Sequence, residues 1–117
     1  MKIAVIGSRK GFEFGDVAPR LNEFYDQTNP AKNSFIIGGA KGVDGFVKEY
    51  ADELNIPIEV IYPRSFDNKI DYLFRNVEII TKADLILAFW NGKSTGTKFV
   101  IDYANARNKE IRIIKKC

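Results

Sequence analysis

The sequence contains no histidine, and its one cysteine is Cys117. The absence of histidine excludes Ser-His-Asp and Cys-His nucleophile systems and the usual zinc sites, so any acid–base chemistry falls to Asp or Glu. One cysteine permits neither an intramolecular disulfide nor a thiolate metal cluster, which is typical of a reducing cytoplasm. No apolar run approaches the roughly 18 residues that span a membrane, and the first residues do not resemble a signal peptide. We therefore expect a cytoplasmic protein with no metal site and no cofactor.

The charge of the chain is only slightly unbalanced. Its 18 basic residues stand against 15 acidic ones, which gives a net charge of +3. Cations mixed this evenly with anions fall short of a nucleic-acid-binding stripe, although they are compatible with an anionic ligand. We therefore expect neither nucleic acid nor a membrane as the partner. The length and the absence of low-complexity linkers predict a single domain over residues 1–117.

Short β-branched runs alternate with segments of helical apolar spacing along the whole chain. Strands are expected at 2–7, 34–37, 58–62, 84–90 and 110–114. Helices are expected from Asp16, taken as an N-cap, and over 43–54, 70–80 and 97–107. In the third helix, the expected apolar face consists of Ile70, Leu73, Phe74, Val77 and Ile80. This alternation predicts an α/β fold, a three-layer sandwich whose parallel sheet of about five strands has the order 3-2-1-4-5, with helices on both faces.

Turns leave the carboxyl ends of the first four expected strands. They read GSRKG (7–11), GGAKG (38–42), YPRS (62–65) and WNGKSTGT (90–97), and each combines a cation with Gly or Ser. Ligands of open parallel sheets bind beyond the strand ends where the strand order reverses, so we expect these turns to converge between the first and fourth strands. Glycine N–H groups, hydroxyls, nearby cations and the helix starts near Val43 and Thr97 favour a phosphate there.

The expected ligand-binding residues come from three of these turns and from the second and third helices. They are Gly7, Ser8, Arg9, Gly38, Gly39, Ala40, Lys41, Gly42, Asp44, Arg75, Trp90, Gly92, Lys93, Ser94, Thr95, Gly96 and Thr97. GGAKG is neither a Walker A sequence nor G-x-G-x-x-G, so conventional NAD chemistry is discounted. Trp90 is equally consistent with a core position and with a base-stacking platform. Phe12, Phe14 and Phe66, expected in loops, fit a lid, a stacking surface or a subunit interface, of which we favour the interface.

Several of these segments together resemble the SLOG superfamily of Rossmann-like domains. They are GSR at 7–9, GGAKGVD at 38–44, Arg75 with Asn76, and ADLILAFWNGKSTGT at 83–97. The resemblance covers nearly the whole chain and is to a small stand-alone branch, known from bacteria and phages as a domain of unknown function. The superfamily includes the Lonely Guy phosphoribohydrolases, DNA-processing protein A, which binds single-stranded DNA, and sensors of NAD-derived nucleotides.

The resemblance implies a nucleotide-like ligand whose phosphate and ribose are held by the glycine-rich turns. The residues that match are Gly38, Gly39, Gly42, Gly92, Ser94, Gly96 and Thr97. Arg75 matches an arginine of the hydrolases. Their motif P-G-G-x-G-T-x-x-E places a glutamate where this chain has Val100, and valine neither accepts a proton nor stabilises a developing cation. We therefore expect no catalytic residue, or Asp44 and Arg75 if the chain is an enzyme.

The leading hypothesis is a module that binds a nucleotide or a nucleotide-derived small molecule, as a sensor or a sequestering protein. The base and the number of phosphates stay open. Loop aromatics and the resemblance also favour a homodimer or larger homo-oligomer. One alternative is a nucleoside 5′-monophosphate N-glycosidase of the phosphoribohydrolase kind. The second alternative is a single-stranded nucleic-acid-binding protein, which the modest charge disfavours.

Overall fold

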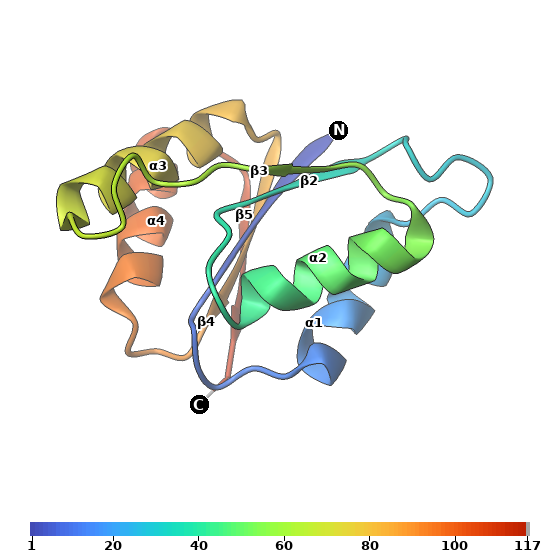
Figure 1. Cartoon of the computed structure of the whole chain (residues 1–117), viewed down its shortest axis with the longest axis horizontal. Coiled ribbons are helices and arrows are strands. Elements are labelled where there is room, and N and C mark those ends of the chain that lie inside the picture. Colours follow the sequence, from blue (N-terminus) through green and yellow to red (C-terminus); the bar gives the residue numbers. More distant parts are fainter. Residues whose placement is uncertain (117) are drawn as a thin grey trace.

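The computed structural model describes residues 1–116, and Cys117, on which the expectations about disulfides rest, lies outside the described residues. Within them the chain forms one five-stranded sheet and four α-helices (Figure 1). The elements are β1 (Lys2–Gly7), α1 (Phe14–Leu21), the 3-10 helix η1 (Asn22–Phe24), β2 (Ser34–Ile37), α2 (Val43–Leu54), β3 (Ile58–Val60), α3 (Lys69–Lys82), β4 (Leu85–Trp90), α4 (Thr95–Ala106) and β5 (Ile111–Lys115). All strand pairs are parallel and the order is β3-β2-β1-β4-β5, which confirms the predicted topology.

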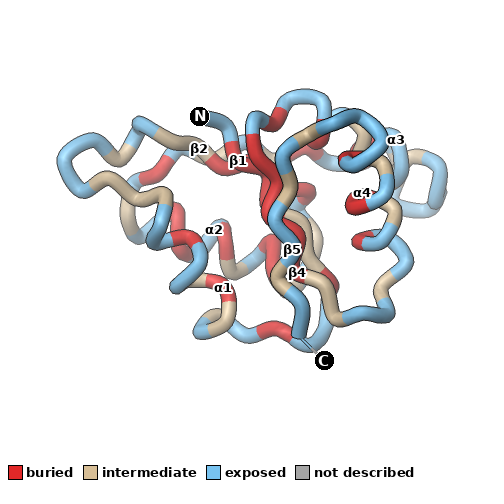
Figure 2. The backbone as a smooth tube through the Cα atoms, turned by 180° about the vertical axis from the view of Figure 1, so that it is seen from behind, coloured by how far each residue is buried: buried red, intermediate tan, exposed pale blue. Residues whose placement is uncertain are grey.

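Helices cover both faces of the sheet. Figure 1 shows α1 and α2 on one side of the strands and α3 and α4 on the other. Because successive side chains of a strand point to opposite faces, Ile3 and Val5 pack with α1 and α2, whereas Ala4 packs with α3 and α4. Each fully buried large aliphatic side chain stabilises the fold by about 1.5–3 kcal/mol. Figure 2 shows these buried residues gathered along the central strands. The two covered faces explain why β4, and β1 after the exposed Lys2, are apolar.

The first helix begins earlier than the sequence suggests. Its N-cap is Glu13, and the expectation that Asp16 caps the helix is wrong. Asp16 lies in the first turn, where its carboxylate accepts the Glu13 backbone N–H at 2.9 Å. A carboxylate can satisfy an unpaired N–H from either position, so sequence alone misplaced the cap. The last helix also begins earlier than expected, at Thr95 after its N-cap Ser94.

The apolar face predicted for α3 is only partly right. Ile80 is buried, but Ile70, Leu73 and Phe74 are 57%, 38% and 67% exposed. Core packing by α3 comes from its second half, where Ile80 joins residues of α4 and the sheet. Figure 1 shows the first turns of α3 farther from the sheet than its last turns. Helical periodicity identifies an apolar face, but it does not show how much of that face meets another element.

Two of the three aromatics expected in loops pack with the core, Phe12 as a buried residue and Phe14 as a partly buried one. Phe12 is 7% exposed and meets the Phe89 ring edge-to-face at 5.6 Å. Phe14, the first residue of α1, packs in the same way on Phe46 at 6.3 Å. The favoured interpretation of a subunit interface is therefore wrong for Phe12, which is buried, and stays a prediction for Phe14, which is only partly buried. Phe66, by contrast, is 64% exposed. In residues 1–116 no helix has the length and apolarity needed to cross a bilayer.

Candidate functional site

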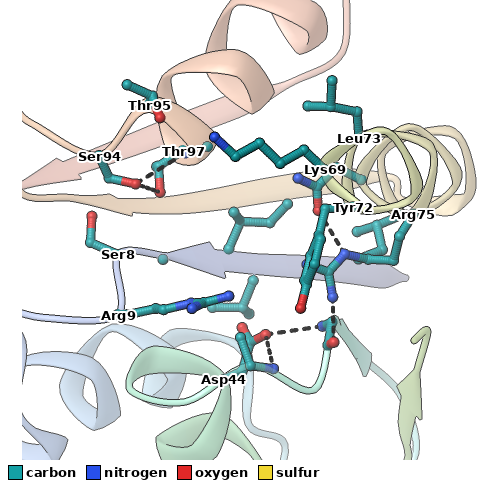
Figure 3. A pocket seen from close by; sticks show the side chains of 18 of the residues that line it. Ser8, Arg9, Asp44, Lys69, Tyr72, Leu73, Arg75, Ser94, Thr95 and Thr97 are labelled. Carbon is teal, nitrogen blue, oxygen red and sulfur yellow. Dashed lines mark hydrogen bonds between the residues drawn. The ribbon is translucent and has the colours of Figure 1, made fainter. Parts of the chain in front are cut away.

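The carboxyl ends of β1 and β4 open into a hollow of about 790 Å³, which we call the main hollow (Figure 3). Its walls come from the end of β1, the turn between β2 and α2, α3, and the turn that leads from β4 into α4. The order of the strands reverses between β1 and β4, and all strands end at the same edge because the sheet is parallel. The turns after β1, β2 and β4 therefore converge where the sequence predicted, although they are separate along the chain. The predicted fourth turn, YPRS at 62–65, does not line this hollow, because only Pro63 of that turn lines a hollow and it is the smaller one described below.

Eleven of the predicted site residues line the main hollow. They are Gly7, Ser8, Arg9, Gly38, Ala40, Asp44, Arg75, Ser94, Thr95, Gly96 and Thr97. Gly39 and Lys41 line a smaller hollow of about 280 Å³, which shares Arg9, Gly38 and Ala40 with the main one. Gly42, Trp90, Gly92 and Lys93 line neither hollow. The predicted grouping is thus largely present, while ligand binding by these residues stays a prediction.

Two of the residues outside the hollows have clear structural roles. Gly42 has a φ of +80°, and a Cβ there would come within 2.6 Å of the Arg9 carbonyl oxygen. Only glycine allows that backbone approach. Trp90 donates its indole N–H to the Ser94 carbonyl at 3.0 Å, and the Lys115 ammonium lies 5.5 Å from its ring centroid. These contacts brace the turn after β4 rather than offer a surface inside the main hollow.

Asp44 holds the turn after β2 in place. Its carboxylate is part of a residue only 7% exposed, and Oδ2 accepts the backbone N–H groups of Gly38 at 3.1 Å and Ala40 at 3.0 Å. The sequence predicted that the backbone N–H groups of this turn donate to a phosphate. The structure gives two of them to an internal carboxylate, because Asp44 follows the turn at the start of α2. An anionic ligand must therefore be attracted largely by cationic side chains and by the start of α4.

Arg75 closes on the same turn from α3. Its Nη1 donates to the Gly38 carbonyl and its Nε donates to Asn76 Oδ1 at 2.9 Å. A Cβ on Gly38 would collide with the guanidinium, so glycine at this position admits the arginine. The Tyr72 ring centroid lies 5.3 Å from the guanidinium carbon, a cation–π distance. Arg75 thus joins α3 to the turn after β2 by a hydrogen bond, and it also adds positive charge to the wall of the main hollow.

Burial sets the protonation behaviour of this pair. Burial raises the pKa of Asp44 to about 6, against the opposing effects of the Ala40 hydrogen bond and the nearby Arg75 charge. Burial likewise lowers the pKa of the Arg75 guanidinium, while Asp44 and Tyr72 oppose that change. Arginine still remains charged near neutral pH. The main hollow therefore contains a carboxyl group that loses its proton as the pH rises through about 6. Cationic side chains line the same hollow.

The turn after β4 is fixed by the Asn91 side chain. Its Oδ1 accepts the N–H groups of Lys93 at 2.9 Å and Ser94 at 2.8 Å. The Asn91 N–H in turn donates to the Ser8 hydroxyl at 3.2 Å, and that hydroxyl donates to the Phe89 carbonyl at 3.4 Å. Ser8 was expected to donate to a phosphate. Its hydroxyl proton is instead used to join the ends of β1 and β4.

The start of α4 forms one wall of the main hollow. Ser94 is the N-cap and accepts the Thr97 N–H at 3.4 Å, and Thr95 and Gly96 are exposed in the first turn. The unpaired N–H groups of a first turn and the positive end of the helix dipole attract anions. This part of the predicted phosphate site keeps the geometry that the prediction required.

The sequence predicted Arg75 of α3 as a site residue but not Lys69 and Tyr72 of the same helix, nor Lys10. Lys10, Lys69 and Tyr72 line the main hollow, and Figure 3 shows Lys69 extending from α3 across it toward Thr97, with Arg9 pointing in from the end of β1. The signal was available in part. Lys69 and Tyr72 precede Arg75 at spacings of three residues, which places all three near one side of a helix. With Arg75 predicted at the site, the helical spacing makes Lys69 and Tyr72 candidates for the same site.

Five cations line the two hollows at this edge of the sheet. Arg9, Lys10, Lys69 and Arg75 line the main hollow, where Asp44 is the one carboxylate among the described lining residues. Lys41 adds a further cation at the smaller hollow. The net charge of +3 therefore understates the local potential, because clefts lined by one sign of charge focus the field. A low overall charge therefore does not exclude a polyanionic partner.

Val100 offers no chemistry at the site. It is fully buried in α4 and packs with Ala4, Ile36 and Ile86 on the α3–α4 face of the sheet. The residue at the position of the hydrolase glutamate thus belongs to the core. Within residues 1–116, no three side chains of His, Cys, Asp or Glu gather in a way that suits a metal ion.

The fold and the position of the main hollow define a Rossmann-like α/β domain with a cationic site at its topological switch point. No model of a known protein family matches the sequence, and no curated protein matches it significantly. Two solved structures share the fold. They are DNA processing protein A from Streptococcus pneumoniae, with a TM-score of 0.77 and 15% identity, and DNA processing protein A from Helicobacter pylori, with 0.68 and 20%.

The similarity covers almost all of this chain and a part of each of those proteins. It extends over 96% of this chain and 49% of the Streptococcus protein, and over 97% of this chain and 64% of the Helicobacter protein. The Helicobacter structure is described as showing a single-stranded DNA binding mode. At these identities the likeness shows a common Rossmann-like fold, which agrees with the fold that the SLOG resemblance implied.

Proposed function

We propose that this chain binds single-stranded nucleic acid, with the phosphate backbone in the main hollow. The observation that carries the proposal is the placement of four cations and the start of α4 around one hollow at the carboxyl edge of the sheet. Phosphates dominate the affinity of nucleic-acid-binding proteins, and grooves with cations and aromatic side chains are typical of those that bind single strands. The fold shared with a protein described as binding single-stranded DNA supports the same assignment.

This proposal replaces the leading hypothesis from the sequence. The expectation of a free nucleotide-like ligand, and the expectation that nucleic acid is not a partner, are both wrong. The two solved structures described above that share this fold are DNA processing proteins, and one of them is described in a single-stranded DNA binding mode. The physical error was to average the charge over the whole surface, whereas a strand responds to the local concentration of cations.

Within this proposal the lining residues have different parts. Lys69 and Arg9 are exposed, reach into the main hollow and contact phosphates directly, while Thr95 and Gly96 present the first turn of α4. Asp44 and Ser8 are committed to internal hydrogen bonds and shape the wall. Tyr72 lies between the cations, where its ring contacts the sugar or base that follows a bound phosphate.

We also infer that the chain is a small SLOG-type domain that acts inside the cell. The segments that carry the resemblance are those that build the walls of the main hollow, including GSR, the GGAKGVD turn and Arg75 with Asn76. The Rossmann-like fold is the part of this inference that stands on the structure itself.

The direct test is fluorescence anisotropy with an unphosphorylated oligothymidine of about 12 nucleotides, a length within the usual site size of single-strand binders. Wild type is expected to bind this oligonucleotide more tightly than a duplex of the same length and more tightly than thymidine monophosphate. Lys69→Ala is expected to weaken binding by roughly 5-fold, because a charge-assisted phosphate contact is lost.

The matched control is Lys48→Ala, which removes a lysine paired with Asp52 on the exposed surface of α2, remote from both hollows. It should bind like wild type. Equal losses in the two variants would show that binding depends on diffuse charge and not on the main hollow. Absence of oligonucleotide binding by the wild type would refute the proposed function.

A further inference from the structure

An exposed aromatic pair lies beside the smaller hollow. Tyr62 and Phe66 are 60% and 64% exposed, and their rings meet edge-to-face with centroids 6.4 Å apart. Both lie in the segment that connects β3 to α3. Contact of large apolar side chains with water is unfavourable in free energy. Exposed apolar surfaces of this kind commonly mark binding sites.

The pair is held against the turn after β2. A Cβ on Gly39 would come within 2.5 Å of Tyr62 Cε1, so the Tyr62 ring lies directly over the glycine backbone. Gly39 has a φ of +72°, a conformation that favours glycine. Tyr62 is therefore supported on one side by the turn and on another by Phe66. These contacts with the turn and between the two rings hold the exposed aromatic surface in place.

The smaller hollow connects this surface to the main hollow. Gly39, Lys41 and Pro63 line only the smaller hollow, whereas Phe66, Tyr72 and Arg9 are among the residues that line both. A strand that leaves the main hollow past Tyr72 thus enters a second depression with Phe66 in its wall. Arg9 and the exposed Lys41 lie along that path.

The chemistry of the smaller hollow fits a nucleotide better than an apolar peptide. A nucleobase offers a π-face to Phe66, and the adjoining phosphate offers charge to Arg9 and Lys41. An apolar protein segment placed there would remove water from both cations without supplying an anion, which is costly. The continuity of the two hollows favours the same conclusion.

We propose that the smaller hollow is a second nucleotide subsite, in which an unpaired base of the bound strand stacks on Phe66 with Tyr62 as its support. This proposal rests on the proposed function, because the strand is first held by phosphate contacts in the main hollow. It adds a direction to that function: the strand runs from the start of α4, past Lys69 and Tyr72, toward the β3–α3 segment. Since every base has a π-face, the subsite tolerates any sequence.

The test compares wild type with Phe66→Ala, Phe66→Leu and Phe66→Tyr on two probes, oligothymidine of about 12 nucleotides and an abasic oligomer of the same length. Phe66→Ala and Phe66→Leu are expected to bind oligothymidine roughly 5-fold or more weakly, because stacking on an aromatic ring is lost. Phe66→Tyr retains the ring and should bind within about 2-fold of wild type. On the abasic oligomer all four proteins should bind alike, and the salt dependence should not change.

The control is Phe74→Ala, because Phe74 is 67% exposed on α3 and lines neither hollow. It should bind oligothymidine like wild type. If wild type binds oligothymidine and Phe66→Ala binds it equally well, the subsite is refuted while the proposed function stands. If wild type binds no oligonucleotide, both proposals fail together. Two other results would assign Phe66 to a contact between copies of the chain and overturn the subsite. One is an equal loss of affinity for both probes in Phe66→Ala, and the other is a smaller molar mass of this variant than of wild type in sedimentation.

Discussion

Asp44 is the residue whose position has the clearest consequence for ligand binding. Its carboxylate secures the Gly38–Ala40 turn, yet it also places a negative charge in a wall otherwise lined by cations. The two effects separate when the carboxylate is protonated, since a neutral carboxyl still accepts hydrogen bonds but no longer repels phosphate. Because burial raises the pKa of Asp44 to about 6, this change falls close to physiological pH.

We therefore expect the affinity for oligothymidine to rise by about 3- to 10-fold as the pH falls from 7.5 to 5, with its midpoint near the Asp44 pKa. Below that pKa the carboxyl is neutral and its repulsion of phosphate is absent; above it the repulsion is complete. The chain has no histidine, and thymine and internal phosphodiesters do not titrate in this range. Anisotropy titrations across the range measure the effect.

Asp44→Asn should remove most of this pH dependence and bind at pH 7.5 about as tightly as wild type does at pH 5. The matched control is Asp102→Asn, an exposed position paired with Lys98 on α4 and outside both hollows. It should retain the wild-type profile. A pH profile that survives in Asp44→Asn would mean that another group is responsible.

At the scale of the elements, α3 is the helix that does most to shape the site. Lys69, Tyr72 and Arg75 project from its first two turns, which leave Ile70 and Phe74 exposed to solvent. These turns gain little from core packing, so local interactions at the start of the helix matter more for them. The Asn68 side chain supplies one such interaction by accepting the Ile70 N–H at 2.9 Å.

Asn68→Ala is expected to lower the free energy of unfolding by about 1 kcal/mol, because the N-cap acceptor is lost. Urea denaturation followed by circular dichroism measures the change. Asn68→Ser keeps a capping oxygen and should lie within a few tenths of a kcal/mol of wild type. If alanine and serine destabilise the protein equally, the cap does not stabilise the start of α3 as the geometry indicates.

At the scale of the whole molecule, the topology of the sheet concentrates charge that the sequence distributes. Arg9 is far in sequence from Lys69 and Arg75 of α3, and the three cations meet because β1 ends at the edge of the sheet that α3 passes over. Several exposed ion pairs elsewhere, such as Lys48 with Asp52 and Lys98 with Asp102, consume cations locally. The five cations that line the hollows are in none of these salt bridges, and Asp44 is the one carboxylate among the described residues that line the hollows.

This distribution predicts the salt dependence of binding. A strand that neutralises its phosphates with the four cations of the main hollow should give a slope of about −3 for log K against log salt concentration, at roughly −0.7 per contact. Arg9→Ala should reduce the magnitude of the slope by about 0.7. Lys98→Ala, at an ion pair on the outer surface of α4, should leave it unchanged. Affinity measurements at several salt concentrations give the slope for each variant. A slope near zero would contradict phosphate-dominated binding.

The sequence by itself determined the fold and the edge at which the site lies. Apolar runs at β1 and β4, helical spacing over 43–54 and short connections leave few ways to bury both faces of a sheet, and the observed strand order is the one predicted. Glycine-rich turns after parallel strands must then share one edge. These inferences succeed because they depend on periodicity and connectivity, which neighbouring residues in the sequence already express.

Only the tertiary structure decided which groups in those turns face a ligand. It turned the Gly38 and Ala40 N–H groups toward Asp44, used the Ser8 hydroxyl between strands and brought Lys69 over the hollow. The physical reason is that hydrogen bonds and electrostatic fields depend on distance in space. Partners can be 30 or more positions apart along the chain, as where Arg75 donates to the Gly38 carbonyl, and no local sequence pattern records such a pairing.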